Sequence, residues 1–179
     1  PGIIHKHHSV VSNHAIDKVE ARADAFYVMD GSDIDDNVAT AVDNVVSLDT
    51  NYVATYYPWV KMENPSGNGL IFVPPSVVIP GVIAFTDSVA HEWFAPAGLN
   101  RGGLSNVRMT KKKLTHTDRD TLYEGRVNPI ASFPGQGVVV FGQKTLQAKP
   151  SALDRINVRR LLIRLKKFIA SSSRFLVFE

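Results

Sequence analysis

The chain has 179 residues, of which 44% are hydrophobic and 21% charged, and it contains no cysteine. This composition is typical of a globular protein with a substantial core and excludes disulfide and thiol chemistry. The apolar runs are too short to cross a bilayer and the first residues lack a signal-peptide core, which argues against membrane insertion and secretion.

The net charge is only +3, but it is distributed unevenly. Between Asp17 and Asp49 there are nine acidic and two basic residues, whereas Ser151 to Glu179 holds seven basic and two acidic ones. A chain with this polarity suits head-to-side assembly or an acidic partner. For any single charge, the alternative is an ordinary solvated surface.

Residues 1–24 form an N-terminal lead-in. Pro1 is not a translation start, so we expect the chain to come from a longer or processed protein. The histidines here lack a regular ligand spacing, so we expect a poorly ordered or partner-docked segment rather than a metal site: His5, His7, His8 and His14. Ile16, Val19 and Ala23 then predict a short helix.

The next part of the chain predicts a strand, a helix and a strand. Phe26–Met29 and Tyr52–Tyr57 are rich in aromatic and apolar residues, and the second strand is expected to continue past Pro58 to Met62. Between them, apolar residues repeat at helical spacing from Ile34 to Val46, with Ser32 or Asp33 as the cap. Such a unit is expected to be parallel and right-handed. The aspartates at its start do not fit the spacing of a calcium loop.

The middle of the chain predicts one strand and two helices. Leu70–Val73 is a third strand, and Pro74–Ser76 leads into a helix with Pro80 in its first turn. A short helix is expected at Thr117–Glu124, with Thr117 and Asp120 at its start and Gly125 beyond its end.

Two further segments in this region predict loops or edges. The glycine-rich stretch Gly98–Gly103 is expected to be flexible. The run Lys111–Lys113 lacks the interleaved aromatic residues of a nucleic-acid binder. We therefore expect a solvated edge or a contact with an acidic neighbouring subunit.

The C-terminal stretch predicts a strand, a long helix and another strand. Val138–Phe141 follows a turn and has the pattern of a buried strand. Asn157 is expected to cap a helix that runs to about Ser171. Its apolar stripe should pack on a core: Leu161, Leu162, Leu165, Phe168 and Ile169. Phe175–Phe178 predicts a further buried strand.

Specific motifs follow one another in order from about Phe26 onward. The C-terminal ones are Asn128–Ile130, Phe141–Leu146, Arg155–Leu161 and Phe178–Glu179. The earlier ones are Tyr56–Trp59, Val73–Ser76, Gly81–Asp87 and Trp93–Gly98. Together they resemble the contractile tail sheath proteins of tailed bacteriophages. Pro80 departs from the family pattern, which usually has a small residue before the glycine.

Strand and helix alternation predicts a layered α/β fold. The resemblance implies more: an α/β three-layer core with a mixed, largely parallel sheet flanked by helices, similar to subtilisin in fold. It also implies that residues 25–147 form the sheath core domain and that residues 148–179 begin a truncated C-terminal sheath domain.

As to function, the resemblance implies a structural subunit that polymerises around a tail tube and contracts to drive the tube through the host envelope. Its partners would be other sheath subunits in hexameric rings, the tail tube protein and the baseplate. No cofactor, metal, nucleic acid or membrane insertion is expected. The subunit would reside in the virion after assembly in the host cytoplasm, and this fragment, without a C-terminal arm, should be monomeric in dilute solution.

Basic residues of the last helix are the candidate partner-binding residues: Arg159, Arg160, Arg164, Lys166 and Lys167. We hypothesise that some of them face an acidic tube or a neighbouring subunit. The alternative is that they solvate the helix and favour its C-terminal end.

Three near-motifs of enzymes are rejected, and no catalytic residue is predicted. Gly137–Thr145 nearly matches a phosphate-binding loop, but Gln143 separates the glycine from the lysine. In His91–Ala95, alanine replaces the second histidine of a zinc helix. Ser105 lacks the second flanking glycine of a nucleophile elbow.

Three other interpretations remain. One is the sheath of a bacterial contractile device of the pyocin type. The second is a subtilisin-like hydrolase, which fold similarity alone cannot support. The third is a basic nucleic-acid binder, which the modest net charge opposes.

Overall fold

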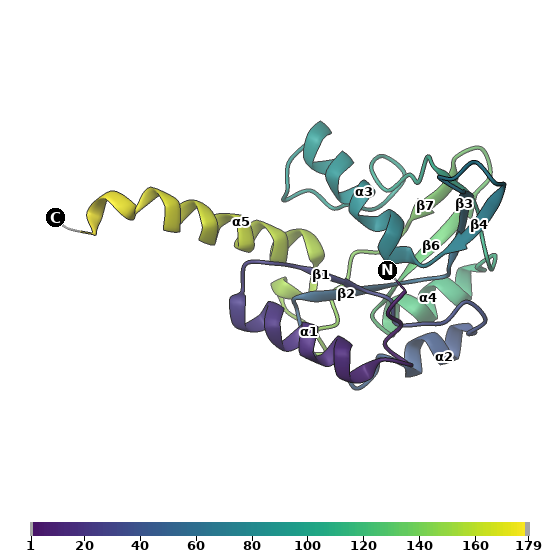
Figure 1. Cartoon of the computed structure of the whole chain (residues 1–179), viewed down its shortest axis with the longest axis horizontal. Coiled ribbons are helices and arrows are strands. Elements are labelled where there is room, and N and C mark those ends of the chain that lie inside the picture. Colours follow the sequence, from purple (N-terminus) through teal and green to yellow (C-terminus); the bar gives the residue numbers. More distant parts are fainter. Residues whose placement is uncertain (1, 178–179) are drawn as a thin grey trace.

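A mixed four-stranded sheet lies at the centre of the computed structural model, which describes residues 2–177 (Figure 1). Its order is β1-β2-β6-β7, with the bounds Tyr27–Met29, Val53–Tyr57, Val127–Phe133 and Gly137–Val140. The first three strands are parallel, and β7 is antiparallel to β6. The predicted α/β class with a mixed, largely parallel sheet is confirmed.

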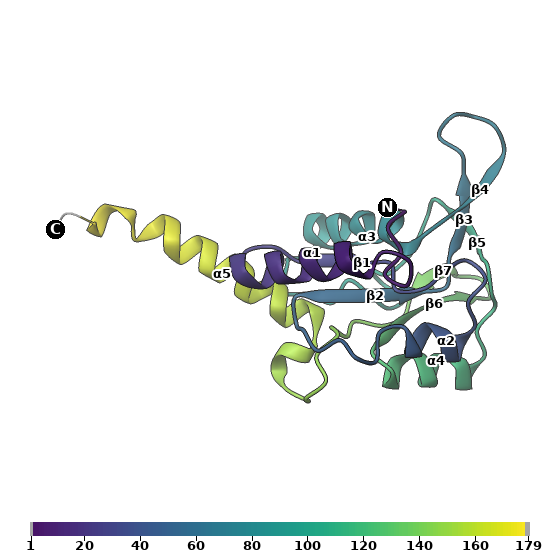
Figure 2. The ribbon, with the colours of Figure 1, turned by 60° about the horizontal axis from the view of Figure 1, so that its bottom comes forward.

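Side chains alternate across this sheet and create two core layers. In β2, Ala54 and Tyr56 face α3 (Pro75–Val89), together with Ile79 and Val82 of that helix. Val53 and Tyr57 point the other way, toward helices α1 (Ser9–Arg22), α2 (Val38–Asp43) and α4 (His116–Glu124). Helices therefore cover both faces of the sheet, as expected for three layers (Figure 2).

A second, smaller sheet follows where the chain leaves β2. It is antiparallel, with the order β4-β3-β5 and the bounds Leu70–Val73, Val60–Glu63 and Val107–Thr110. The expectation that the strand of residues 52–57 continues past Pro58 is therefore wrong, because β3 belongs to this other sheet. Pro58 has no N–H to donate to a neighbouring strand, so the chain leaves the central sheet at a residue that would interrupt strand pairing in any case.

Two strands escaped prediction from the sequence. The central strand β6 contains Asn128 and Pro129, residue types that are depleted in strands. The fully buried amide of Asn128 is satisfied by the main chain, since its Nδ2 donates to the carbonyls of Thr55 and Lys144 and its Oδ1 accepts from the Lys144 amide. The other missed strand is β5.

The N-terminal segment is ordered by contacts with the rest of the chain. The expectation that it is poorly ordered is therefore wrong. Ile4 bridges Asp30 in parallel, and the buried His5 donates its main-chain N–H to the Asp30 carbonyl at 2.8 Å. Lys6 and His7 pair with Asp36 and Asp33. The predicted short helix is the much longer α1.

Helix starts differ from the predicted ones because other side chains are better placed to cap. Asn37, rather than Ser32 or Asp33, accepts the Thr40 N–H at the start of α2. At α4, a reciprocal capping box joins Thr115 and Asp118, so Thr117 and Asp120 are not the caps.

The position of Pro80 within its helix was also mispredicted. Pro75 takes the favourable first position of α3, and Pro80 lies inside the helix. Pro80 is exposed, and its missing N–H removes the one helical hydrogen bond to the carbonyl of Ser76, four residues earlier.

The glycine-rich loop 98–103 is not free, contrary to its expected flexibility. It runs along the outer edge of β7, where the Gly98 N–H donates to the Val140 carbonyl and the Val140 N–H donates to Gly102, both at 2.8 Å. A Cβ on Gly102 would lie 2.5 Å from the Val140 carbonyl oxygen, so only glycine allows this approach. The loop thereby protects the edge of the sheet.

The last helix, α5 (Ile156–Ser172), follows the short 3-10 turn η1 (Ala152–Asp154) and projects away from the body of the molecule (Figures 1 and 2). It is capped by Arg155 without a side-chain bond. Asn157 is therefore in the first turn and is not the predicted cap.

Candidate assembly surface

The root of α5 is fixed to the core by its first turns. Ile156 is fully buried in the core layer that contains Tyr56 and Ile79. Arg159 is only 5% exposed, and its guanidinium lies 4.1 Å from the ring centre of Tyr52 while donating to that hydroxyl. A candidate partner-binding residue is thus enclosed within its own chain.

Two further cations hold the root against the segment that ends α3. Arg160 pairs with Asp87 at 2.5 Å and donates to the Glu92 carbonyl at 3.2 Å. Arg164 lies 3.5 Å from the Glu92 carboxylate, in a more exposed position. These partners were not predicted, because residues 68 to 73 positions apart in the chain give no local signal of contact.

Beyond Arg164 the helix is exposed on all sides. Lys166 and Lys167 are exposed, and neither forms an ion pair within residues 2–177. Phe168 and Ile169 are each 61% exposed. The expectation that the whole apolar stripe packs on a core is therefore wrong beyond Ile163.

The predicted final strand is also wrong where it can be checked. Arg174–Leu176 form a 3-10 turn, and Phe175, Leu176 and Val177 are largely exposed. A strand requires a partner for its main-chain groups, and none is near this end of α5 in the described structure. Phe178 and Glu179 lie outside the described residues.

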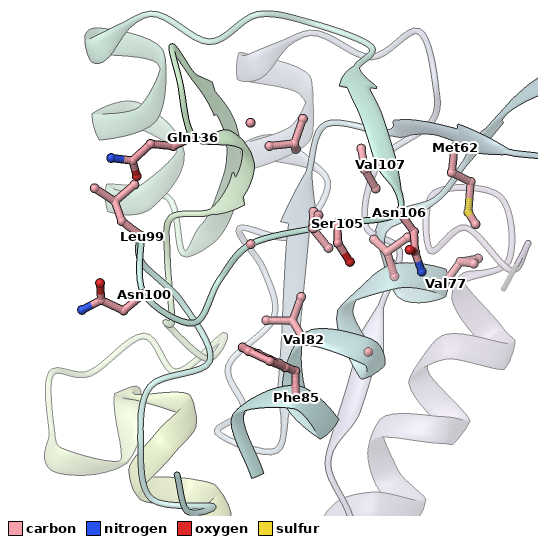
Figure 3. Close-up of a pocket in the computed structure, with 16 residues that line it drawn as sticks. Met62, Val77, Val82, Phe85, Leu99, Asn100, Ser105, Asn106, Val107 and Gln136 are labelled. Carbon is pink, nitrogen blue, oxygen red and sulfur yellow. The ribbon is translucent and has the colours of Figure 1, made fainter. Parts of the chain in front are cut away.

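An open apolar groove lies between α3 and the segment 99–107, with a volume of about 660 Å³ (Figure 3). Val77, Val82 and Phe85 of α3 form one wall, and polar side chains are contributed by Asn100, Ser105, Asn106 and Gln136. Its described lining includes no titratable residue. Ser105 therefore lies exposed in a groove without a histidine to activate it.

The other rejected motifs occupy structures that suit packing. The phosphate-loop-like stretch contains β7, whose Val138 to Val140 are buried in the sheet. His91 stacks on Trp93 at 4.3 Å in the turn after α3. No cluster of potential metal ligands and no helix able to span a membrane occurs among residues 2–177.

Comparison with known proteins gives a consistent result. The family model of the phage tail sheath protein central domain matches residues 4–146. The tail sheath proteins of Vibrio phage KVP40 and Enterobacteria phage T4 are 44% and 43% identical over 108 residues, or 60% of this chain. The chain spans only 16% of the length of each of these two relatives.

A solved sheath structure shows the same architecture. The sheath complex of an extracellular contractile injection system in its contracted state superposes with a TM-score of 0.73 and 29% identity. The match covers 86% of this chain and 42% of that one.

Proposed function

Because the chain belongs to the phage tail sheath protein family, we propose that it is the core part of one subunit of a contractile tail sheath. The main observation behind this proposal is that the family's central-domain model matches residues 4–146, which contain both core layers of the sheet except Ile156. The relatives are several times longer, so this core would be one part of a larger subunit.

In this proposal the chain has three parts. Residues 1–24 are a lead-in docked on the core, residues 25–147 are the sheath core domain, and residues 148–179 begin the C-terminal sheath domain. The third part is supported by α5, which leaves the core after one buried turn and carries an uncovered apolar face. In the larger subunit, that face would be covered by further residues of the same domain.

The partners would be neighbouring sheath subunits, the tail tube and the baseplate, in a particle assembled in the host cytoplasm. Among the candidate basic residues, Arg159 and Arg160 are engaged inside the chain, and Arg164 is partly engaged. Lys166 and Lys167 are exposed and unpaired within the described structure, so we assign the contact with an acidic partner to them.

Contraction would use the core as a rigid unit. A close-packed core of this kind does not deform continuously, so interfaces between subunits would exchange while each core keeps its shape. A kinetic barrier would hold the extended polymer until it is triggered. No cofactor enters this mechanism.

The nearest rival is the sheath of a bacterial contractile injection device. The similarity to the extracellular injection system supports it at 29% identity. Identity to the two phage proteins is higher, at 43 and 44%, and favours a phage tail.

Electron microscopy of the longer protein expressed alone tests this function. We expect tubular polymers with a helical ring repeat. The double substitution Lys166→Glu/Lys167→Glu should still allow tubes to form but should weaken their attachment to tail tubes. Monodisperse particles without any polymer would overturn the sheath assignment and make a peptidase assay the next experiment.

A further inference from the structure

The outward face of the small sheet combines exposed apolar side chains with lysines. Lys61 stands directly opposite Phe72 on one side and Met109 on the other, so the three share one face. Lys61 and Lys111 both lie 5.2 Å from the Phe72 ring centre. Leu70, two residues before Phe72, adds to the same face.

We use the name lysine face for this surface together with the two exposed lysines that follow Lys111 directly in the chain; its residues are Lys61, Leu70, Phe72, Met109, Lys111, Lys112 and Lys113. Leu70 and Met109 are each nearly half exposed. Lys111 pairs with Asp35 and the adjacent Arg108 with Glu63, while Lys61, Lys112 and Lys113 form no ion pair in the described chain. The face therefore carries an uncompensated positive charge around an apolar centre.

The opposite charge gathers in two adjoining hollows beside α1. They share Glu20, Asp49 and Thr50 and have volumes of about 470 and 210 Å³. Asp17 lines the smaller hollow, whose floor includes Ile16 and Leu48. We call this surface the acidic groove.

Its carboxylates have no cationic partner in the fold. Asp17, Glu20 and Asp49 are exposed and form no ion pair within residues 2–177. Lys149 is the one cation that lines the described hollows. Like the lysine face, the groove thus combines an apolar floor with unpaired charge, but of the opposite sign.

The two surfaces lie at opposite ends of one strand. Thr50 to Tyr52 line the acidic groove immediately before β2 begins, and the chain enters β3 of the lysine face immediately after β2 ends. Figure 1 shows α1 and the β3–β4 hairpin correspondingly far apart. One copy therefore cannot satisfy its own lysine face with its own groove.

We propose that the lysine face docks on the acidic groove of a second copy of this chain. The lysines would meet the unpaired carboxylates, while Phe72 and Met109 would cover the apolar floor. Such a head-to-tail contact is heterologous, and repeating it generates rings or helical polymers. The inference rests on the proposed sheath function and names a surface through which neighbouring subunits join.

Reversing the charge of each surface in separate variants, and then mixing the variants, tests the contact. Two variants of the whole chain are needed, Lys112→Glu/Lys113→Glu and Asp17→Lys/Glu20→Lys, at exposed and unpaired positions. In concentrated, low-salt solution, each should lower the association constant in sedimentation equilibrium by about tenfold or more, because like charges would face each other. An equimolar mixture of the two should restore association, since each altered surface then meets its complement.

The matched control is Asp43→Lys/Glu124→Lys, which makes the same charge change as Asp17→Lys/Glu20→Lys at two exposed carboxylates of α2 and α4 and should leave this association unchanged. Circular dichroism melting of every variant checks that the fold is retained. Unchanged association in both altered variants, no restoration in the mixture, or an equal loss in the control would overturn the contact.

Cross-linking provides a second measurement in the polymer. Since the chain has no cysteine, Lys112→Cys and Glu20→Cys introduce the only thiols into this region. A short bismaleimide should join separate copies in tubes of the longer protein, and absence of any joined copies would overturn the proposal. Normal tubes from longer protein that carries the charge reversal on only one of the two surfaces would refute this contact but leave the sheath function standing. Wild-type longer protein without tubes would refute the function itself.

Discussion

The helices α1 and α5 both lie near an end of the chain, yet they relate to the core in opposite ways. α1 has a weak apolar pattern, but Ile16 and Ser12 are buried and the preceding residues pair with residues 30–36. α5 has a pronounced apolar stripe, yet only its root is covered. An amphipathic pattern shows that a face must be covered, but the available neighbours decide whether this chain covers it.

The largest expected effect on stability comes from replacing isoleucine by alanine at the buried end of α5, compared with the same replacement at its exposed end. Ile156→Ala removes a fully buried side chain and should lower the free energy of unfolding by about 2–5 kcal/mol. Ile169→Ala, at 61% exposure, should change it by no more than about 0.5 kcal/mol. Urea denaturation followed by tryptophan fluorescence measures both, and similar costs would show that the distal helix is packed in solution.

The packing of α1 can be challenged in the same way. Ile16→Ala should cost about 2 kcal/mol, at the lower end for core isoleucines because the residue lies at the edge of its cluster. Val10→Ala, at 82% exposure, is the matched control and should have almost no effect. A neutral Ile16→Ala would show that α1 is not packed on the core in solution.

The cationic contacts at the root should differ according to burial. Arg159→Ala removes a desolvated cation from the face of Tyr52 and should cost about 2 kcal/mol. Arg164→Ala removes an exposed pair and should cost less than about 1 kcal/mol. Hydrogen exchange should show faster exchange at residues 156–162 only in the first variant. Equal protection in both would mean that Arg159 does not fix the root.

The smallest effect concerns the pH dependence of the lead-in. Burial lowers the pKa of His5 below its ordinary value of 6.5, because the charged form is poorly solvated there. On acidification, the unfolded chain therefore takes up this proton first, so stability is complete above pH 6.5 and falls below it until the folded pKa is reached.

The substitution His5→Leu should consequently reduce the loss of stability between about pH 7 and pH 5. The exposed His14→Ala is the control and should leave that loss unchanged. Denaturation midpoints across the pH range provide the measurement. Parallel pH profiles for wild type and His5→Leu would remove the contribution assigned to His5.

Strongly periodic elements were predictable from the sequence, because their pattern reflects their own burial. β1, β4 and β7 lie within one residue of their predicted bounds, β2 begins within one residue of its predicted start, and the end of α5 was also close. β6 was missed because Asn128 and Pro129 are residue types that rarely occur in strands. Its burial depends on bonds from Asn128 to Thr55 and Lys144, and these contacts are invisible until the strands are assembled.

The candidate site was only partly predictable for a related reason. The sequence places five basic residues on α5 but does not show which of them are free to contact a partner. Tyr52, Asp87 and Glu92 capture Arg159, Arg160 and, less tightly, Arg164, so that Lys166 and Lys167 differ from the rest. The partner role of these lysines remains a prediction for the charge-reversal experiment.

By itself, the sequence determined the α/β class, the sheath family and the uneven distribution of charge, since these follow from local pattern and from an ordered series of motifs. Only the tertiary structure decided that the lead-in is docked, that α5 leaves the core after its root, and that unpaired lysines and carboxylates lie at opposite ends of β2. The physical reason is that burial and charge pairing depend on which distant residues become neighbours, and local sequence patterns do not encode that choice.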